Sequence, residues 1–195
     1  PATGGNVLVT LASAFASVSD MAYDLTGDPS PRILFFSDGT SVVRDVTPVA
    51  TGGFVTSVFA GGGTIATDGT SKDTFDFGSP VTSLYASDSS IYVGVQASKI
   101  YRIDVSSGLV YRFLGDGVAE SSGDDGPATS ARIREATDIV EDSDGNVWIV
   151  DRASAVVRVV DAAGVITTVA GTGVSGSNGD PGSPLATQLD EPRGI

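Results

Sequence analysis

The 195-residue chain contains no cysteine and no histidine. Without cysteine it forms no disulfide and offers no thiolate, and without histidine it has no imidazole base and no histidine ligand for zinc. A serine or threonine nucleophile would need a carboxylate or one of the two lysines as its base, and no pattern marks such a pair. The composition therefore gives no support to nucleophilic catalysis in this stretch.

Long apolar runs and a leader sequence are also missing. No apolar run approaches the roughly 20 residues of a membrane span, and the N-terminus lacks the pattern of a secretory signal. We therefore expect no direct membrane insertion. Pro1 is not a natural first residue, and we interpret it as a position inside a longer protein.

Basic residues are few and dispersed, with 2 Lys and 9 Arg against 20 Asp and 4 Glu, for a net charge of −13. A polyanion such as RNA binds to a clustered basic surface, and the sequence shows no such cluster. Asp favours turns over helices, so much of the acidity is expected in surface turns. We therefore expect no nucleic-acid partner.

The sequence is rich in short apolar runs that are bounded by Asp, Gly and Asn. Such runs, rich in Val and Ile and closed by turn residues, are typical of antiparallel strands in a meander. Four of them follow one another between residues 136 and 170: Ile139-Val140, Val147 to Asp151, Val156 to Val160 and Val165 to Ala170.

An internal repeat underlies this pattern. The loops at 123–133 and 179–189 both span eleven residues, begin with Gly-Asp and end on an aliphatic residue, and their offset is 179 − 123 = 56. A weaker copy at 67–77 has the same offset from the first of these loops, since 133 − 77 = 56. Four strands per unit at this period predict the blades of a β-propeller.

The motifs of the last unit resemble those of NHL-repeat β-propellers. The shared pattern is an Asp-Gly-Asn turn, an aromatic-containing strand that ends in Asp, a hydrophobic-Arg pair, a Thr-Thr-Val-Ala-Gly-x-Gly strand end, a Gly-Asp-rich loop and a Pro-x-Gly-Ile start of the next unit. The resemblance is closest over 116–195 and weaker over 80–115. The residues that carry it are Asp144 to Asn146, Trp148, Asp151, Val157, Arg158, Thr167 to Gly171, Gly173, Gly179, Asp180, Leu189 and Pro192 to Ile195.

The resemblance implies an all-β fold, a β-propeller with about three four-stranded blades that form part of a six-bladed ring. The run Val7 to Leu11 fits the last strand of a preceding blade. The ring then closes through further blades on the same polypeptide, which we favour, or through a second copy of this chain. The expected divisions are the end of a preceding blade or a closing strand at 1–19, blades with their connecting loops at 20–79, 80–135 and 136–191, and the start of a further blade at 192–195.

The first unit departs most from the pattern, because it has longer loops at 25–31 and 47–53. Its expected strands are 21–23, 33–36, 41–46 and 54–59, and those of the second unit are 84–85, 91–93, 99–103 and 109–113.

Arginine recurs at one position on the third strand of each unit, as Arg44, Arg102 and Arg158. One interpretation is a ring of guanidinium groups on the outer surface. The other, which we favour, is a repeated cross-strand partner, for example Asp151 with Arg158. Trp148 lies mid-strand in the last unit and is expected to be buried between blades.

Nine acidic residues lie between positions 116 and 144, and only Arg132 and Arg134 oppose them. These acids form either a rim that attracts a cation or a basic partner, or, as we favour, a solvated loop that repeats between blades. The candidate ligand-binding residues are Asp124, Asp125, Arg134, Asp138 and Arg193.

The stretch from Asp142 to Asn146 resembles the start of a calcium-binding loop. Its twelfth position is Ala153 rather than Glu, and a strand follows instead of a helix. We therefore interpret it as a hairpin turn and favour no metal. If calcium does bind, the candidate ligands are Asp142, Asp144 and Asn146.

Two functions remain open. The resemblance implies a non-catalytic recognition or scaffold module that binds protein or glycan through the propeller loops, and it favours an extracellular or cell-surface location. The alternative is a calcium-dependent lactonase or hydrolase whose other ligands lie in blades outside this chain. In that case Asp138, near the start of an innermost strand, is the best channel-facing carboxylate. We expect no cofactor, or calcium alone if this alternative holds.

Overall fold

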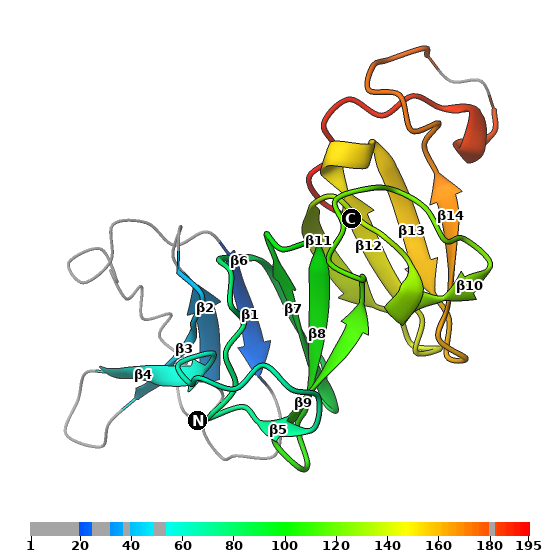
Figure 1. Ribbon diagram of the computed structural model, residues 1–195. Helices are drawn as coiled ribbons and strands as arrows, with labels where there is room; N and C mark the ends of the chain where they lie inside the picture. The colour runs from blue at the N-terminus through cyan, green and yellow to red at the C-terminus, as the bar shows by residue number, and fades with distance from the viewer. Residues whose placement is uncertain (1–19, 25–31, 37–39, 49–53, 180–181) are drawn as a thin grey trace.

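The computed structural model is all-β and describes residues 20–24, 32–36, 40–48, 54–179 and 182–195 (Figure 1). Its strands form three antiparallel sheets. The first sheet has the order β1-β2-β3-β4 and consists of β1 (Asp20–Asp24), β2 (Arg32–Phe36), β3 (Val43–Pro48) and β4 (Phe54–Ala60).

The second and third sheets are built alike, each with four consecutive strands and a two-residue strand added at the outer edge. The second sheet consists of β6 (Val81–Ala86), β7 (Ser90–Val95), β8 (Lys99–Asp104), β9 (Leu109–Leu114) and the edge strand β5 (Thr70–Ser71). The third consists of β11 (Ala136–Glu141), β12 (Val147–Asp151), β13 (Val156–Val160), β14 (Val165–Ala170) and the edge strand β10 (Gly126–Pro127). The described residues also form three short 3₁₀ helices, η2 (Ala128–Ser130), η3 (Arg152–Ser154) and η4 (Pro184–Ala186).

Turn chemistry explains why the strands pair in these registers. At the β13–β14 turn, the Asp161 carboxylate accepts hydrogen bonds from the backbone N–H groups of Ala163 and Val165, each at 2.9 Å. Gly164 in the same turn has φ +81°, a conformation that glycine adopts without steric cost. The tight turn fixes the pairing of Val160 with Ile166 and so decides which residues face the core.

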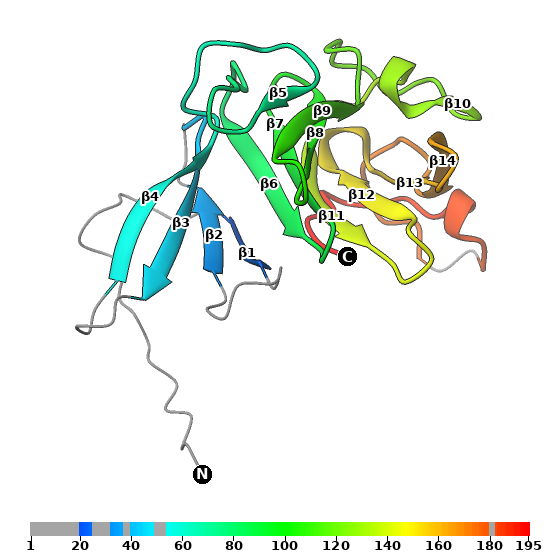
Figure 2. The same cartoon turned by 90° about the horizontal axis from the view of Figure 1, so that it is seen from below.

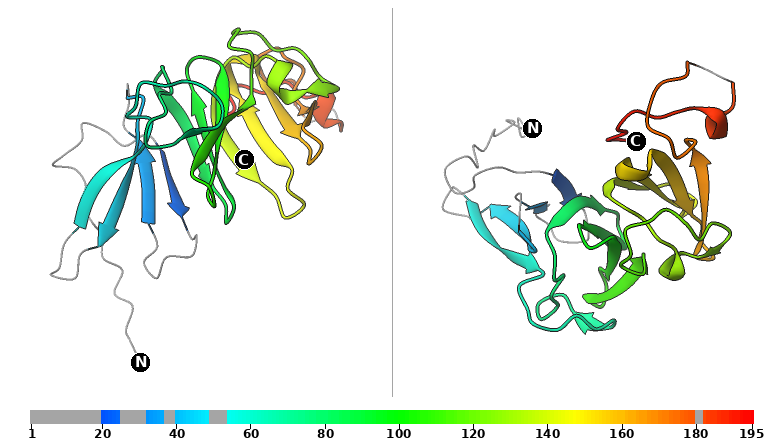
Figure 3. Two further views of the ribbon diagram at one scale, coloured as in Figure 1. Left: turned by 60° about the horizontal axis from the view of Figure 1, so that its bottom comes forward. Right: turned by 45° about the horizontal axis from the view of Figure 1, so that its top comes forward.

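The three sheets stand side by side like blades, with their innermost strands β1, β6 and β11 adjoining (Figures 2 and 3). One apolar core, which includes Phe75, Tyr101 and Val43, lies between the first and second sheets. Another, which includes Tyr92, Ile139 and Ile149, joins the second and third. Every residue of β7 is buried, because this strand has a sheet on each side. The blade arrangement predicted from the repeat is confirmed.

The period of the sequence repeat reappears in the backbone pairing. Thr70 of β5 pairs with Val110 of β9, and Gly126 of β10 pairs with Ile166 of β14. The two pairs are one repeat apart at both partners, since 126 − 70 = 56 and 166 − 110 = 56. The connecting loop therefore adds its edge strand to the blade that follows it, whereas the sequence division placed each loop with the blade that precedes it.

Two expectations about side chains are wrong. Arg158 pairs with Asp124 of the connecting loop and not with Asp151. Trp148 is only half-buried, because strand alternation places Ile149 in the core and Trp148 on the opposite face of the third sheet, which none of the described sheets covers. The indole N–H of Trp148 donates to Asp142 Oδ2 at 2.9 Å.

Other expectations fall on residues that the structure does not describe. The strand expected at Val7 to Leu11 and the loop at 25–31 lie outside the described residues, as does 49–53 of the expected 47–53 loop. β3 continues through Pro48. No helix within the described ranges is long and apolar enough to cross a membrane.

Candidate ligand-binding cleft

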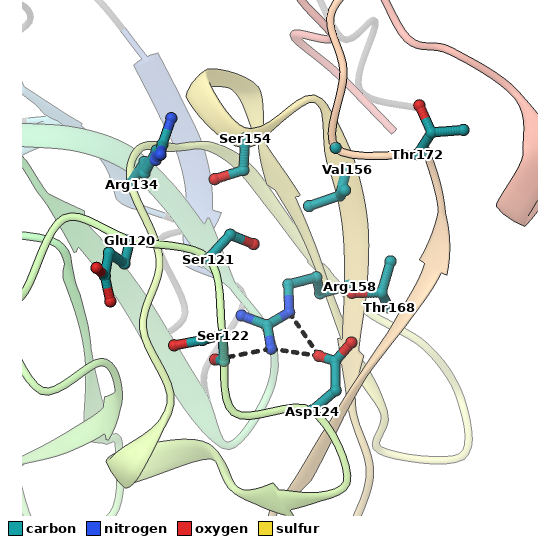
Figure 4. Close-up of a pocket in the computed structure, with 12 residues that line it drawn as sticks. Glu120, Ser121, Ser122, Asp124, Arg134, Ser154, Val156, Arg158, Thr168 and Thr172 are labelled. Atoms are coloured by element: carbon teal, nitrogen blue, oxygen red, sulfur yellow. Dashed lines mark hydrogen bonds and ion pairs between the residues drawn. The ribbon is translucent and has the colours of Figure 1, made fainter.

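A polar cleft of about 690 Å³ lies between the loop that connects the second blade to the third and the strands β13 and β14 of the third blade (Figure 4). Its volume is within the range of about 300–1,000 Å³ that is usual for small-molecule sites. The lining residues are mostly hydroxyl-bearing, charged or glycine: Glu120, Ser121, Ser122, Asp124, Arg134, Ser154, Val156, Arg158, Thr168, Gly171, Thr172 and Gly173.

Arg158 forms one wall of the cleft and is fully buried, with 0% of its surface exposed. Its guanidinium pairs with Asp124 and donates to two backbone carbonyl oxygens, those of Arg132 at 2.8 Å and of Ser122 at 3.2 Å. A buried charge is tolerated only when it is paired and hydrogen-bonded. The arginine therefore fastens the connecting loop to the third blade and shapes the cleft between them.

Asp124 is the anionic partner of this pair and sits at the cleft surface. Burial on its own would raise the pKa of Asp124, but hydrogen bonds from Thr168 and from the Arg158 guanidinium outweigh it and lower the pKa below its ordinary value. The equivalent residue of the second blade is Asp68, since 124 − 68 = 56, and it accepts the backbone N–H of Arg112 at 3.0 Å. Fastening the loop to the outermost strand through an Asp is thus a repeated feature.

Arg134 stands at the rim of the cleft on a backbone that is held from two sides. Its N–H donates to both carboxylate oxygens of the fully buried Asp151, at 3.1 and 3.3 Å, and its carbonyl accepts the Ser98 hydroxyl at 3.3 Å. Its side chain is exposed and makes no ion pair with any described residue. It also borders a neighbouring hollow of about 490 Å³ that includes Gln96 and Glu135.

Ser154 contributes a buried hydroxyl to the lining. Only 5% of the residue is exposed, and its Oγ has no hydrogen-bond partner among the described residues. Ser98 is the equivalent residue of the second blade, since 154 − 98 = 56, and its hydroxyl is satisfied by the carbonyl of Arg134. In Figure 4 Ser154, Ser121 and Arg158 surround the same space.

The structure brings together only two of the five candidate ligand-binding residues, Asp124 and Arg134. Asp125 does not line the cleft, and its carboxylate accepts the Thr167 hydroxyl at 3.4 Å. Arg193 is paired with Glu191 at 3.0 Å, and it too lies outside the cleft. Sequence reasoning missed Ser154 and the Ser121-Ser122 pair as lining residues, because serines in loops and between strands give no signal of their own.

Asp138 lies on the innermost strand β11, apart from the cleft. Its Oδ2 accepts the backbone N–H of Ile195 at 2.9 Å. The equivalent positions one repeat before and one repeat after it hold Thr82 and Gly194, so these neighbouring units bring no further carboxylate there. Within the described ranges no three His, Cys, Asp or Glu side chains come together as a metal site would require.

The expected hairpin at Asp142 to Asn146 is present. Asp142 Oδ1 accepts the backbone N–H groups of Asp144 and Asn146, each at 2.9 Å, and Oδ2 accepts the Asn146 amide at 3.0 Å. The Trp148 indole and Asn146 hydrogen bonds lower the pKa of Asp142 to about 2. The carboxylate that would be a calcium ligand is thus engaged within the turn itself.

No protein-family model matches the sequence, and no curated protein matches it. Among solved structures, a protein of unknown function from Bacteroides thetaiotaomicron is similar at 22% identity, with a TM-score of 0.66, over 91% of this chain and 41% of that chain. An auxiliary nutrient binding protein from the same organism is similar at 20% identity, with a TM-score of 0.60, over 89% and 42%. Virginiamycin B lyase from Staphylococcus aureus is similar at 14% identity, with a TM-score of 0.51, over 91% and 44%.

These similarities establish the fold. The neighbours are β-propeller-like proteins, and the chain is a partial β-propeller that spans less than half the length of each of them.

Proposed function

We propose that this chain is part of a non-catalytic recognition module of the NHL-repeat type, and that it binds a saccharide in the cleft between the connecting loop and the third blade. The observation that carries the proposal is the lining of the cleft, which presents Ser121, Ser122, Ser154, Thr168 and Thr172 beside charged groups. Hydroxyls, carboxylates and guanidinium groups match the alternating donors and acceptors of a sugar ring.

The similar structures support a binding role more than a catalytic one. One of them is described as an auxiliary nutrient binding protein. Another is a lyase that is described as catalytically inactive when one histidine is replaced by alanine, and the present chain has no histidine. The part of the fold that these 195 residues form spans 44% of the lyase and does not itself supply that histidine.

Isothermal titration against a panel of neutral and acidic oligosaccharides tests the proposal. We expect at least one to bind saturably, and Thr172→Trp, which fills the cleft, to abolish that binding. Ser130→Trp is the matched control, because Ser130 is exposed on η2 and does not line the cleft. If no saccharide binds, or if both variants bind equally well, the proposal is wrong, and a protein ligand becomes the better hypothesis.

A further inference from the structure

We infer that the saccharide bound in the cleft carries a carboxylate, and that Arg134 is the residue that recognises it. The inference rests on the proposed function and names its substrate class. An acidic sugar, such as a uronic acid, fits the charges of this cleft although the chain as a whole carries −13.

The charges of the lining residues leave Arg134 uncompensated. Glu120 is paired with Arg132 at 2.6 Å, and Asp124 is paired with the buried Arg158. Each acid that lines the cleft therefore already has an arginine partner, which Glu120 shares with Asp116 at 2.8 Å, whereas the guanidinium of Arg134 has no ion-pair partner among the described residues. A single unpaired cation at the rim favours a ligand with one negative group.

Arg134 is also positioned in advance. Asp151 holds its N–H and Ser98 holds its carbonyl, so binding need not order its backbone. The planar guanidinium binds the two oxygens of a carboxylate in a fork, which a lysine cannot do. The second blade has no such group, because the equivalent position one repeat earlier is Gly78.

Ser154 supplies a second contact. Its buried hydroxyl has no partner among the described residues, and leaving a buried polar atom unsatisfied is unfavourable. A ligand hydroxyl or ring oxygen that enters the cleft satisfies it. Arg134 thus binds the acidic group of the ligand, and Ser154 binds a hydroxyl or ring oxygen of the sugar.

The test compares a methyl glycoside of galacturonic acid, which carries one carboxylate, with its methyl ester, which has the same ring and hydroxyls but no charge. We expect titration to show at least tenfold tighter binding of the acid, and the difference to shrink as salt is raised. Arg134→Gln should remove that preference, so that the acid and the ester bind with similar affinity. Arg193→Gln is the matched control, because it removes the same charge from an exposed arginine outside the cleft.

Ser154→Ala should weaken both ligands to a similar extent. Unchanged melting temperatures of the variants show that the fold is intact. Equal affinity for acid and ester, or a preference that survives Arg134→Gln, would overturn the inference while leaving saccharide binding in place. Failure of every saccharide in the larger panel to bind would instead overturn the proposed function.

Discussion

The buried carboxylate of Asp151, at the end of β12, accepts the backbone N–H of Arg134 at the rim of the cleft. It also accepts the N–H of Glu135 at 2.9 Å. An aspartate that the sequence marks only as a strand end thus positions the loop that enters the third blade. The second blade lacks this link, because Val95 stands at the equivalent position one repeat earlier.

Asp151→Asn should destabilise the protein by about 1–3 kcal/mol, because an amide presents one acceptor where the loop needs two and brings its own donors against those N–H groups. Urea denaturation followed by circular dichroism measures the change. Asp144→Asn is the control, since the exposed Asp144 side chain makes no hydrogen bond with the described residues. If Asp151→Asn leaves the free energy of unfolding unchanged, this link does not hold the loop.

Asp124 and Asp125 are adjacent acids with different surroundings. Asp124→Asn removes the charge that faces the buried Arg158 and should cost about 1–2 kcal/mol, less than a fully buried pair because Asp124 is partly exposed. Asp125→Asn should be nearly neutral, since Asn tolerates the φ of +60° found there. Chemical denaturation measures the loss of stability in each variant. Equal losses would contradict the role given to the ion pair.

The hydrogen bonds of the Asp142 carboxylate should make the stability of the protein depend on pH in the acidic range. The pKa of Asp142 is about 2 in the folded chain, below its ordinary 3.8, so its contribution is complete above the ordinary value and is lost as pH falls from about 4 to about 2. The difference in melting temperature between the wild type and Asp142→Asn should therefore be largest near neutral pH and vanish near pH 2. A difference in melting temperature that stays constant over this pH range would refute the lowered pKa of Asp142.

Calcium should not stabilise the same turn, because the oxygens of Asp142 already accept hydrogen bonds from Asp144, Asn146 and Trp148. A ligand that binds the native state raises the melting temperature. We therefore expect the same melting temperature in millimolar calcium and in chelator. A large rise that Asp144→Ala abolishes would establish a calcium site here and revive the calcium-dependent alternative.

Substituting the glycine that follows β14 shows how much a steric collision adds to the cost of a left-handed backbone. A Cβ on Gly171 would collide with the carbonyl oxygen of Ala155, and φ is +94°. Gly171→Ala should cost about 2–5 kcal/mol, with roughly 1–2 from the left-handed backbone and roughly 1–3 from displaced neighbours. Gly164→Ala has a similar φ of +81° but open space, and should cost only about 1–2 kcal/mol by the first effect. Denaturant unfolding measures the loss of stability in both variants. Equal losses would show that the neighbours of Gly171 move aside at little cost.

Much of the fold was determined by the sequence on its own. Strand positions follow from local chemistry, since runs such as Val156 to Val160 alternate between the two faces of a sheet, and turns such as Asp161 to Gly164 close them. The repeat then indicated that each unit packs against the next, because one such sheet cannot bury both its faces alone. These are local or periodic features, and they can be recognised in the sequence without the tertiary structure.

The tertiary structure alone decided which side chains meet. Arg158 and Asp124 are 34 residues apart, and the connecting loop had to fold back over the next blade before they could pair. Trp148 is half-buried rather than enclosed, because strand alternation puts Ile149 in the core and Trp148 on a face that no described sheet covers. The cleft exists for the same reason: Arg134 and Ser154 come from different segments, and only the packing of a loop against two strands brings them to one space.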